Sequence, residues 1–197
     1  MNHVQNHVTN ATLAAALLAA GLAGCAASNQ PAPTNAGTVT QAEVSSQQLT
    51  DGQIVGIVAA IDAAEIGAGK LAMSHATGAA ARQFAEHMMS AHTSMDSSLM
   101  TVAHEQDITV ARSALCEKLK SDNQAEAQTL ASLPNGDFDR KYLTAQLKGH
   151  EDVLGLLDDK LIPMAENAKL KAALEDARGK VVEHIRMAKE ALASVGS

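Results

Sequence analysis

The stretch "KYLTAQLKGHEDVLGLLDDKLI", residues 141–162, carries the clearest helical pattern in the chain. Its apolar residues recur every three or four positions, so they form one stripe along an α-helix. The stripe consists of Leu143, Leu147, His150, Leu154, Leu157 and Leu161, and His150 is its one polar member. A stripe of this kind is buried against other helices. The question is what the histidine contacts there.

The composition of the whole chain favours a helical fold. Of its 197 residues, 46% are apolar and only 2% are aromatic, and much of the apolar fraction is alanine. The scarcity of Tyr, Phe and Trp argues against a β-sheet. The net charge is −7, and no basic stripe offers contacts to phosphates, which argues against nucleic acid as a partner.

The first residues predict export. "ATLAAALLAAGLAG", residues 11–24, is an apolar run of signal-peptide length, too short to span a bilayer. It ends at Leu22-Ala23-Gly24-Cys25, which resembles a bacterial lipobox. The resemblance implies that residues 1–24 are a lipoprotein signal peptide, that Cys25 is lipidated and that acyl chains anchor the protein in a membrane. Ala26 after the cysteine favours the outer membrane, with the protein facing the periplasm.

Residues 25–48 are rich in Ser, Thr, Asn, Gln, Ala and Pro, and we expect a flexible tether there. The folded domain is then expected at residues 49–195. Cys116 is the second cysteine of the chain. With Cys25 lipidated, no internal disulfide could form. We therefore interpret Cys116 as a small apolar residue at a helix interface rather than a redox group.

Three further long helices are predicted. The first begins after Thr50 or Asp51, either of which can cap its first turn, and the second follows a break at Thr77-Gly78. The third, which contains residues 141–162, ends or bends at Pro163, and the fourth spans about 167–193. Residues 107–136 read as an excursion of one or two short helices. The simplest arrangement is an all-α, up-down-up-down four-helix bundle with that excursion between its second and third helices.

Each predicted helix carries one ionisable residue on its apolar stripe: Glu65, His92, His150 and His184. Counted from the connecting turns, all four fall near the middle of the bundle. Burying one such group alone costs several kcal/mol, so four at a similar level are expected to satisfy one another or to share a cation. Imidazole and carboxylate suit Zn, Fe, Mn or Cu. The alternative is a hydrogen-bonded His/Glu cluster that fixes the helix register or senses pH.

Methionine offers a variant of the metal hypothesis. Met88 and Met95 flank His92 at helical spacing, and Met187 follows His184 by three residues. Thioether and imidazole together suit Cu(I). Methionine also fills gaps in alanine-rich cores, and we favour this packing role for the three residues.

The sequence contains no motif of a known catalytic device. The leading hypothesis is a non-catalytic protein that holds a metal ion at the Glu/His cluster. The second is a structural or stress-related envelope lipoprotein whose polar cluster only specifies packing. Ferroxidase or other oxidoreductase activity is the weakest of the three, because the paired Glu-x-x-His motifs of di-iron bundles are absent from the inward stripes.

Four segments, in this order, resemble the domain of unknown function 4142 family: "LTDGQIVGIVAAIDAAEIGAGKLA", "ARQFAEHMMSAHT", "FDRKYLTAQLKGHEDVL" and "VVEHIRMAKEAL". The resemblance covers about residues 48–193 and implies a secreted or outer-membrane protein with a ferritin-like four-helix bundle. The matched segments contain Glu65, His92, His150 and His184. One departure is Gly179, where the family commonly has proline. Because one fold supports many chemistries, the resemblance indicates the fold and not the function.

Overall fold

The computed structural model describes residues 48–195, and this part of the chain is helical, without a β-strand. The all-α prediction is therefore confirmed for these residues. The predicted signal peptide and Cys25 lie outside them, as does the predicted tether apart from Gln48. The long helices are α2 (Asp51–His75), α3 (Ala79–Glu105), α4 (Ala114–Ala131), α5 (Asn135–Leu156) and α7 (Ala168–Ser194).

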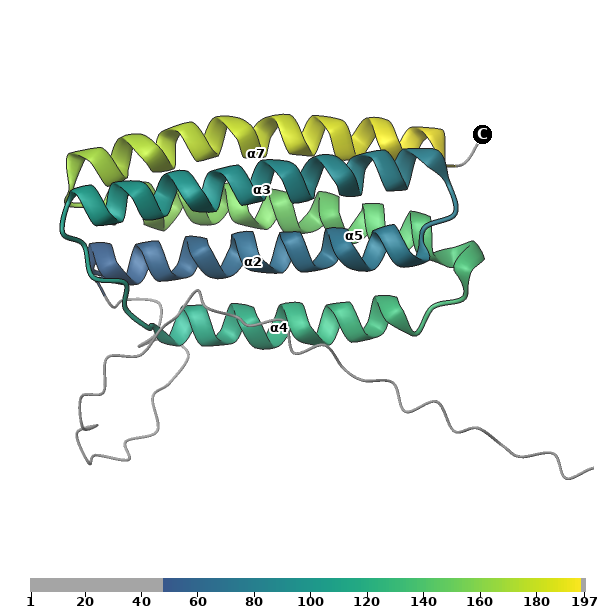
Figure 1. Cartoon of the computed structure of the whole chain (residues 1–197), viewed down its shortest axis with the longest axis horizontal. Helices are drawn as coiled ribbons and strands as arrows, with labels where there is room; N and C mark the ends of the chain where they lie inside the picture. Colours follow the sequence, from purple (N-terminus) through teal and green to yellow (C-terminus); the bar gives the residue numbers. More distant parts are fainter. Residues whose placement is uncertain (1–47, 196–197) are drawn as a thin grey trace, which may run out of the picture.

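Four of the long helices, α2, α3, α5 and α7, lie side by side, and α4 lies along the outer side of α2 (Figure 1). α2 packs on α3 and α4, and α7 packs on both α3 and α5. The predicted excursion is thus a single helix of 18 residues, α4. It returns the chain to the end at which α3 begins, so α3 and α5 run in the same direction (Figure 1). The predicted up-down-up-down order is therefore wrong: with α4 as a full-length return, the four helices α2, α3, α5 and α7 run up-down-down-up.

No helix within residues 48–195 has the length and apolar character that crossing a bilayer would require.

Two carboxylates fix the ends of the helices relative to one another. Asp139 of α5 accepts hydrogen bonds from the backbone N–H groups of Thr77 and Gly78, at 3.1 and 2.6 Å. It thereby caps α3, whose own N-cap residue Gly78 has no side chain to do so. At the other end, Asp51 accepts from the backbone N–H groups of Glu166 and Asn167, both at 2.9 Å. These contacts fix the axial position of α3 relative to α5 and of α7 relative to α2.

The connection between α3 and α4 crosses the backbone of α2 closely. α3 ends in a Schellman motif, with Asp107 in the left-handed region (φ 52°) and the N–H of Ile108 bonded to the carbonyl of Ala103. The connection then passes over Gly52 and Gly56, where an added Cβ would lie 2.2 and 2.4 Å from backbone oxygens of residues 109 and 111. Only glycine allows this approach.

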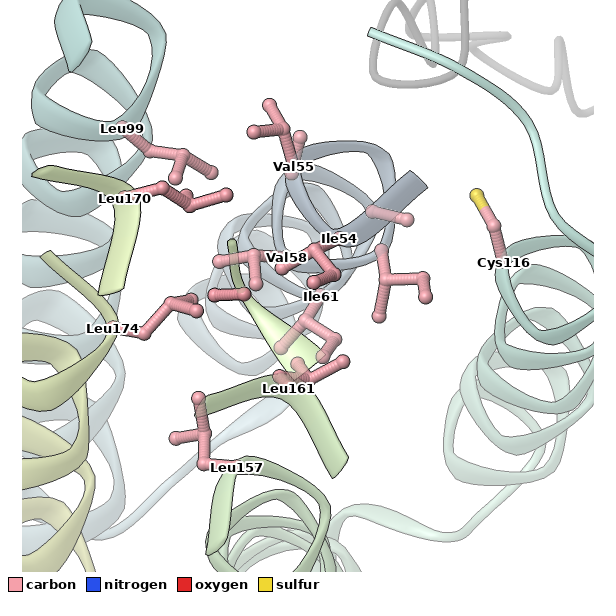
Figure 2. Packing of buried hydrophobic residues seen from close by; sticks show 14 of the residues in the cluster. Ile54, Val55, Val58, Ile61, Leu99, Cys116, Leu157, Leu161, Leu170 and Leu174 are labelled. Carbon is pink, nitrogen blue, oxygen red and sulfur yellow. The ribbon is translucent and has the colours of Figure 1, made fainter. Parts of the chain in front are cut away.

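The core divides into two apolar clusters along the helix axes. One contains Leu99, Leu161, Leu174 and most of the first half of α2, and the other is built around Phe84, Phe138 and Tyr142. In the first, side chains from α2, α3, α7 and the segment after α5 converge, while Cys116 approaches from α4 (Figure 2). Cys116 is buried at the α2–α4 interface, where its Sγ lies 3.5 Å from the backbone oxygen of Gly56.

The ends of the predicted helices agree well with the structure, but the first helix has no single buried face along its first half. The first half of α2 is buried on all sides, because α4 covers the face that would otherwise meet solvent. Near Pro163 the predicted break has a specific form: the chain widens into a π-helix, η2 (Leu157–Leu161), followed by one short turn, α6 (Ile162–Met164). Proline lacks the N–H that an α-helix needs at this point. α7, in contrast, runs through Gly179 without a break.

Candidate metal centre

The three histidines on the apolar stripes form one buried cluster. His92 of α3, His150 of α5 and His184 of α7 are each 2% exposed. One ring nitrogen of each lies within 4.8 Å of those of the other two. The cluster lies between the two apolar clusters of the core: on α3, for example, Met88 belongs to one and Leu99 to the other. It forms a polar layer in the middle of the helices.

His92 is held by a carboxylate from α2. Its Nδ1 lies 2.7 Å from Oδ1 of Asp62, which is only 1% exposed. A carboxylate accepts, so the proton of the pair lies on Nδ1 of His92 and its Nε2 presents a lone pair. This Nε2 is fully buried and has no hydrogen-bond partner.

His150 is held in the same sense by its own helix. Its Nδ1 lies 2.8 Å from the backbone oxygen of Gln146, and because a carbonyl only accepts, Nδ1 donates. Nε2 of His150 then carries the lone pair, and it lies 3.3 Å from Nδ1 of His184. Two nitrogens bound to one tetrahedral zinc ion at about 2.0–2.1 Å are separated by about 3.3 Å. The His150–His184 pair therefore already has the spacing of two ligands of one ion.

This arrangement matches the way proteins orient metal-binding imidazoles. Metal-ligating histidines almost always donate their second ring N–H to a carboxylate or a backbone carbonyl, which fixes the tautomer and the ring orientation. Asp62 does this for His92, and the carbonyl of Gln146 does it for His150. The rings of His92 and His150 are thus held in fixed orientations, with the lone pair of each Nε2 facing the interior of the cluster.

Burial disfavours the charged form of His184. The pKa of His184 is lowered to about 3, first by burial and then by the neighbouring His92, His150 and His87. His184 is therefore a neutral imidazole near pH 7. The pKa of Asp62 is raised, mainly by burial, with further contributions from Asp96 and Glu65, although the contact with His92 opposes the rise.

Glu65 was predicted to join the histidines, and it lies beside them rather than among them. It is half-buried and lines a cavity of about 20 Å³ together with Asp62, His92 and His150. The three-nitrogen group does not include it. Its Oε2 is buried without a hydrogen-bond partner. Glu65 also contributes to the raised pKa values of Tyr142 on α5 and of Glu126 on α4, in both cases after burial.

The three methionines occupy packing positions. Met88 is completely buried in the second apolar cluster, against which Met187 packs. Met95 lines the cavity beside Asp62 and His92. Of the three, it is therefore the methionine that shares a cavity with the cluster.

Sequence reasoning missed Asp62, although a signal was present. It is the single charged residue in "IVGIVAAIDAA", residues 54–64, and an acid within such an apolar run is expected to have a buried partner. Asp62 does not lie on the face that contains Glu65, and a single inward face does not describe this helix, because its first half is buried all round. The contact of His150 with Gln146 involves a backbone oxygen and leaves no mark in the sequence.

Comparison with known proteins identifies the family to which the chain belongs. The sequence model described as "Domain of unknown function (DUF4142)" matches residues 34–191. The chain belongs to this family. Searches of curated proteins and of solved structures each found no match. All four residues singled out from the sequence, and Asp62, lie within the DUF4142 match, so the polar layer is part of the family domain. The family description assigns no function, and the chemistry must be inferred from the site itself.

Proposed function

We propose that this protein binds a transition-metal ion through His92, His150 and His184. The observation that supports this most is the Nε2 of His92, a buried lone pair without a partner at the edge of a group of three imidazoles. Leaving such an atom unsatisfied costs about 1–3 kcal/mol, and a bound cation removes that cost. Asp62 acts as the positioning residue, holding the ring of His92 and balancing part of the charge of the ion.

The donor set favours an ion that accepts neutral imidazole. Three histidines with one open position suit Zn²⁺, and Cu²⁺ is the next candidate. Glu65 lines the adjoining cavity and supplies a carboxylate near the open position. A coupled pair of iron ions requires about four carboxylates, whereas Asp62 and Glu65 are the acids beside this cluster, so the proposal is a binding function rather than a ferroxidase.

The test is metal content. The full chain, purified without a histidine tag and incubated with Zn²⁺, Cu²⁺, Mn²⁺ or Fe²⁺, is expected to retain about one ion per chain by mass spectrometry. The variant His150→Ala/His184→Ala should retain none while keeping its helical circular dichroism. His104→Ala removes an exposed histidine and serves as the control. An unmetallated parent protein after all four incubations would sink the proposal.

The second candidate function is structural. His92 pairs with Asp62, and His150 with His184, so the polar layer satisfies much of its hydrogen bonding without any ion. On this alternative the layer fixes the register of the helices. His150→Leu would then preserve the fold and raise its stability, since apolar replacements of buried polar groups are often stabilising. Under the metal proposal, the same variant loses the stabilisation that the ion supplies.

We also propose a setting for the domain. The side-by-side packing of α2, α3, α5 and α7 supports a ferritin-like four-helix bundle with α4 as its excursion, in the order up-down-down-up. The lipobox-like "LAGC" supports anchoring of the domain to the outer membrane through lipidated Cys25, with the domain in the periplasm. In a bacterial host, Cys25→Ala should abolish incorporation of labelled palmitate and release the protein from the membrane fraction. Unchanged labelling in that variant would contradict the anchor.

A further inference from the structure

A second cavity lies next to the one at the histidines. It has a volume of about 60 Å³ and extends between α2, α3 and α7. The two cavities share four lining residues: Val58, Asp62, Met95 and Ala177. The inner cavity has room for about one water molecule, and the outer one has room for several.

The outer cavity connects the buried cluster with the surface. Its inner wall includes Asp62 and Leu99, which are 1% and 5% exposed. Its outer wall includes Ser98, Asp176 and Lys180, which are all exposed. Lys180 and Asp176 form an ion pair at 2.9 Å along α7, on one side of the mouth. We call the two cavities together the α3–α7 passage.

We propose that a metal ion reaches the histidine cluster through the α3–α7 passage, with Asp62 as its first inner ligand. This inference rests on the proposed metal-binding function and deepens it. Oδ2 of Asp62 is fully buried and has no hydrogen-bond partner, while Oδ1 is occupied by His92. Asp62 lines both cavities, so a cation arriving from the surface meets its carboxylate before it reaches the lone pairs of His92 and His150.

Two features of the passage control the rate of uptake. Ala177 is the small residue of α7 where the two cavities join, so a larger side chain there narrows the junction. Lys180 places a positive charge at the mouth, which slows the approach of a cation, although Asp176 partly offsets it. The route therefore admits small ions and keeps bulky chelators away from the cluster.

The test measures uptake and release of Co²⁺, whose visible spectrum reports tetrahedral coordination. Rapid mixing of the full chain with Co²⁺ gives the association rate, and a chelator in excess gives the release rate. Ala177→Leu should slow both rates by about tenfold or more and leave Kd nearly unchanged, because a barrier on the path affects the two directions equally. Ala172→Leu, at an exposed position of the same helix, is the control.

Lys180→Gln should act in the opposite direction, speeding uptake at low salt and losing this advantage at high salt. Lys118→Gln, on α4, removes a similar exposed charge outside the passage and should change nothing. A parent protein that binds no Co²⁺ or other metal defeats the proposed function. A parent that binds metal, with Ala177→Leu as fast as the parent, defeats only the passage. Slowing in His87→Ala alone would place entry at the exposed ring beside His184 instead.

Discussion

Nδ1 of His92 lies 2.7 Å from Oδ1 of Asp62, and both side chains are almost completely excluded from solvent. The pair joins α3 to α2 and fixes which nitrogen of His92 faces the other two histidines. A single buried contact thus links the helix packing to the chemistry of the cluster. The contribution of Asp62 can be separated from that of the ligands by replacing its charge alone.

Asp62→Asn is expected to weaken metal binding without unfolding the protein. The amide keeps the shape of the side chain but removes the charge that orients and polarises His92, and changes of this kind cost about 10–100-fold in affinity. A competition titration with a zinc-binding dye measures the change. Asp159→Asn, at an exposed acid on η2, should leave the affinity as it is. An unaltered affinity in Asp62→Asn would show that His92 needs no orienting group.

Glu65→Gln should reduce metal affinity less than His92→Ala does. Glu65 lines the cavity but lies outside the three-nitrogen group, so its loss removes a nearby charge and not a ligand of that group. The same titration compares the two variants. Equal losses would instead place Glu65 among the direct ligands, as predicted from the sequence.

Acid is expected to destabilise the metal-free protein. The pKa of His184 is about 3 in the folded state, through burial and the nearby His92, His150 and His87, against 6.5 for the free side chain. Between these values the unfolded chain binds a proton that the folded protein does not. The free energy of unfolding therefore falls as pH drops from about 6.5 towards 3, by up to about 1.4 kcal/mol per pH unit for this one group.

Urea unfolding at several pH values, with a strong chelator present, measures this loss. His184→Leu removes the titrating group, so its stability should depend less steeply on pH over the same range. Parallel pH profiles for the parent and the variant would show that His184 does not titrate in this way.

Tyr142→Phe should leave the protein as stable or make it about 1 kcal/mol more stable, because an unsatisfied buried hydroxyl carries a desolvation cost. The hydroxyl of Tyr142 is buried and has no partner, and burial together with the charge of Glu65 raises its pKa. Thermal and urea unfolding test this directly. A clear loss of stability would indicate that an ordered water or ion bonds this hydroxyl.

Two glycines of α2 should respond in opposite ways to alanine. At Gly56 the new Cβ would lie 2.4 Å from the backbone oxygen of Ala111, and we expect a loss of about 1–3 kcal/mol as in other overpacked sites. At Gly67 there is open space, so alanine should stabilise the helix by up to about 1 kcal/mol. The comparison uses the same helix and the same chemical change. Equal effects at both positions would argue against the close crossing.

The helices and the three histidines could be predicted because they depend on local periodicity. An apolar stripe interrupted by a single histidine identifies the buried face of α3, α5 and α7 without knowledge of the neighbours. The choice between Asp62 and Glu65 could not be made in this way, since α2 has no solvent-facing side along its first half. It depends on α4, whose position is a tertiary property.

Contacts between segments far apart in the sequence also could not be predicted from local sequence patterns. Asp139 caps α3 from more than 60 positions away, and Asp51 binds the backbone before α7. Neither residue differs from an ordinary helix-start acid in its local sequence. The π-helix before Pro163 was predicted only as a break, because proline removes one hydrogen bond but does not dictate how the chain rearranges.

The spacing of Gly52 and Gly56 gives a means of sorting the relatives of this chain. Backbone oxygens of residues 109 and 111 occupy the space where side chains at these two positions would start. In a relative with glycine at both positions, the α3–α4 connection can cross α2 as it does here. In a relative with a larger residue at either position, the α3–α4 connection must follow a different path. The helix equivalent to α4 would then cover a different face of the bundle.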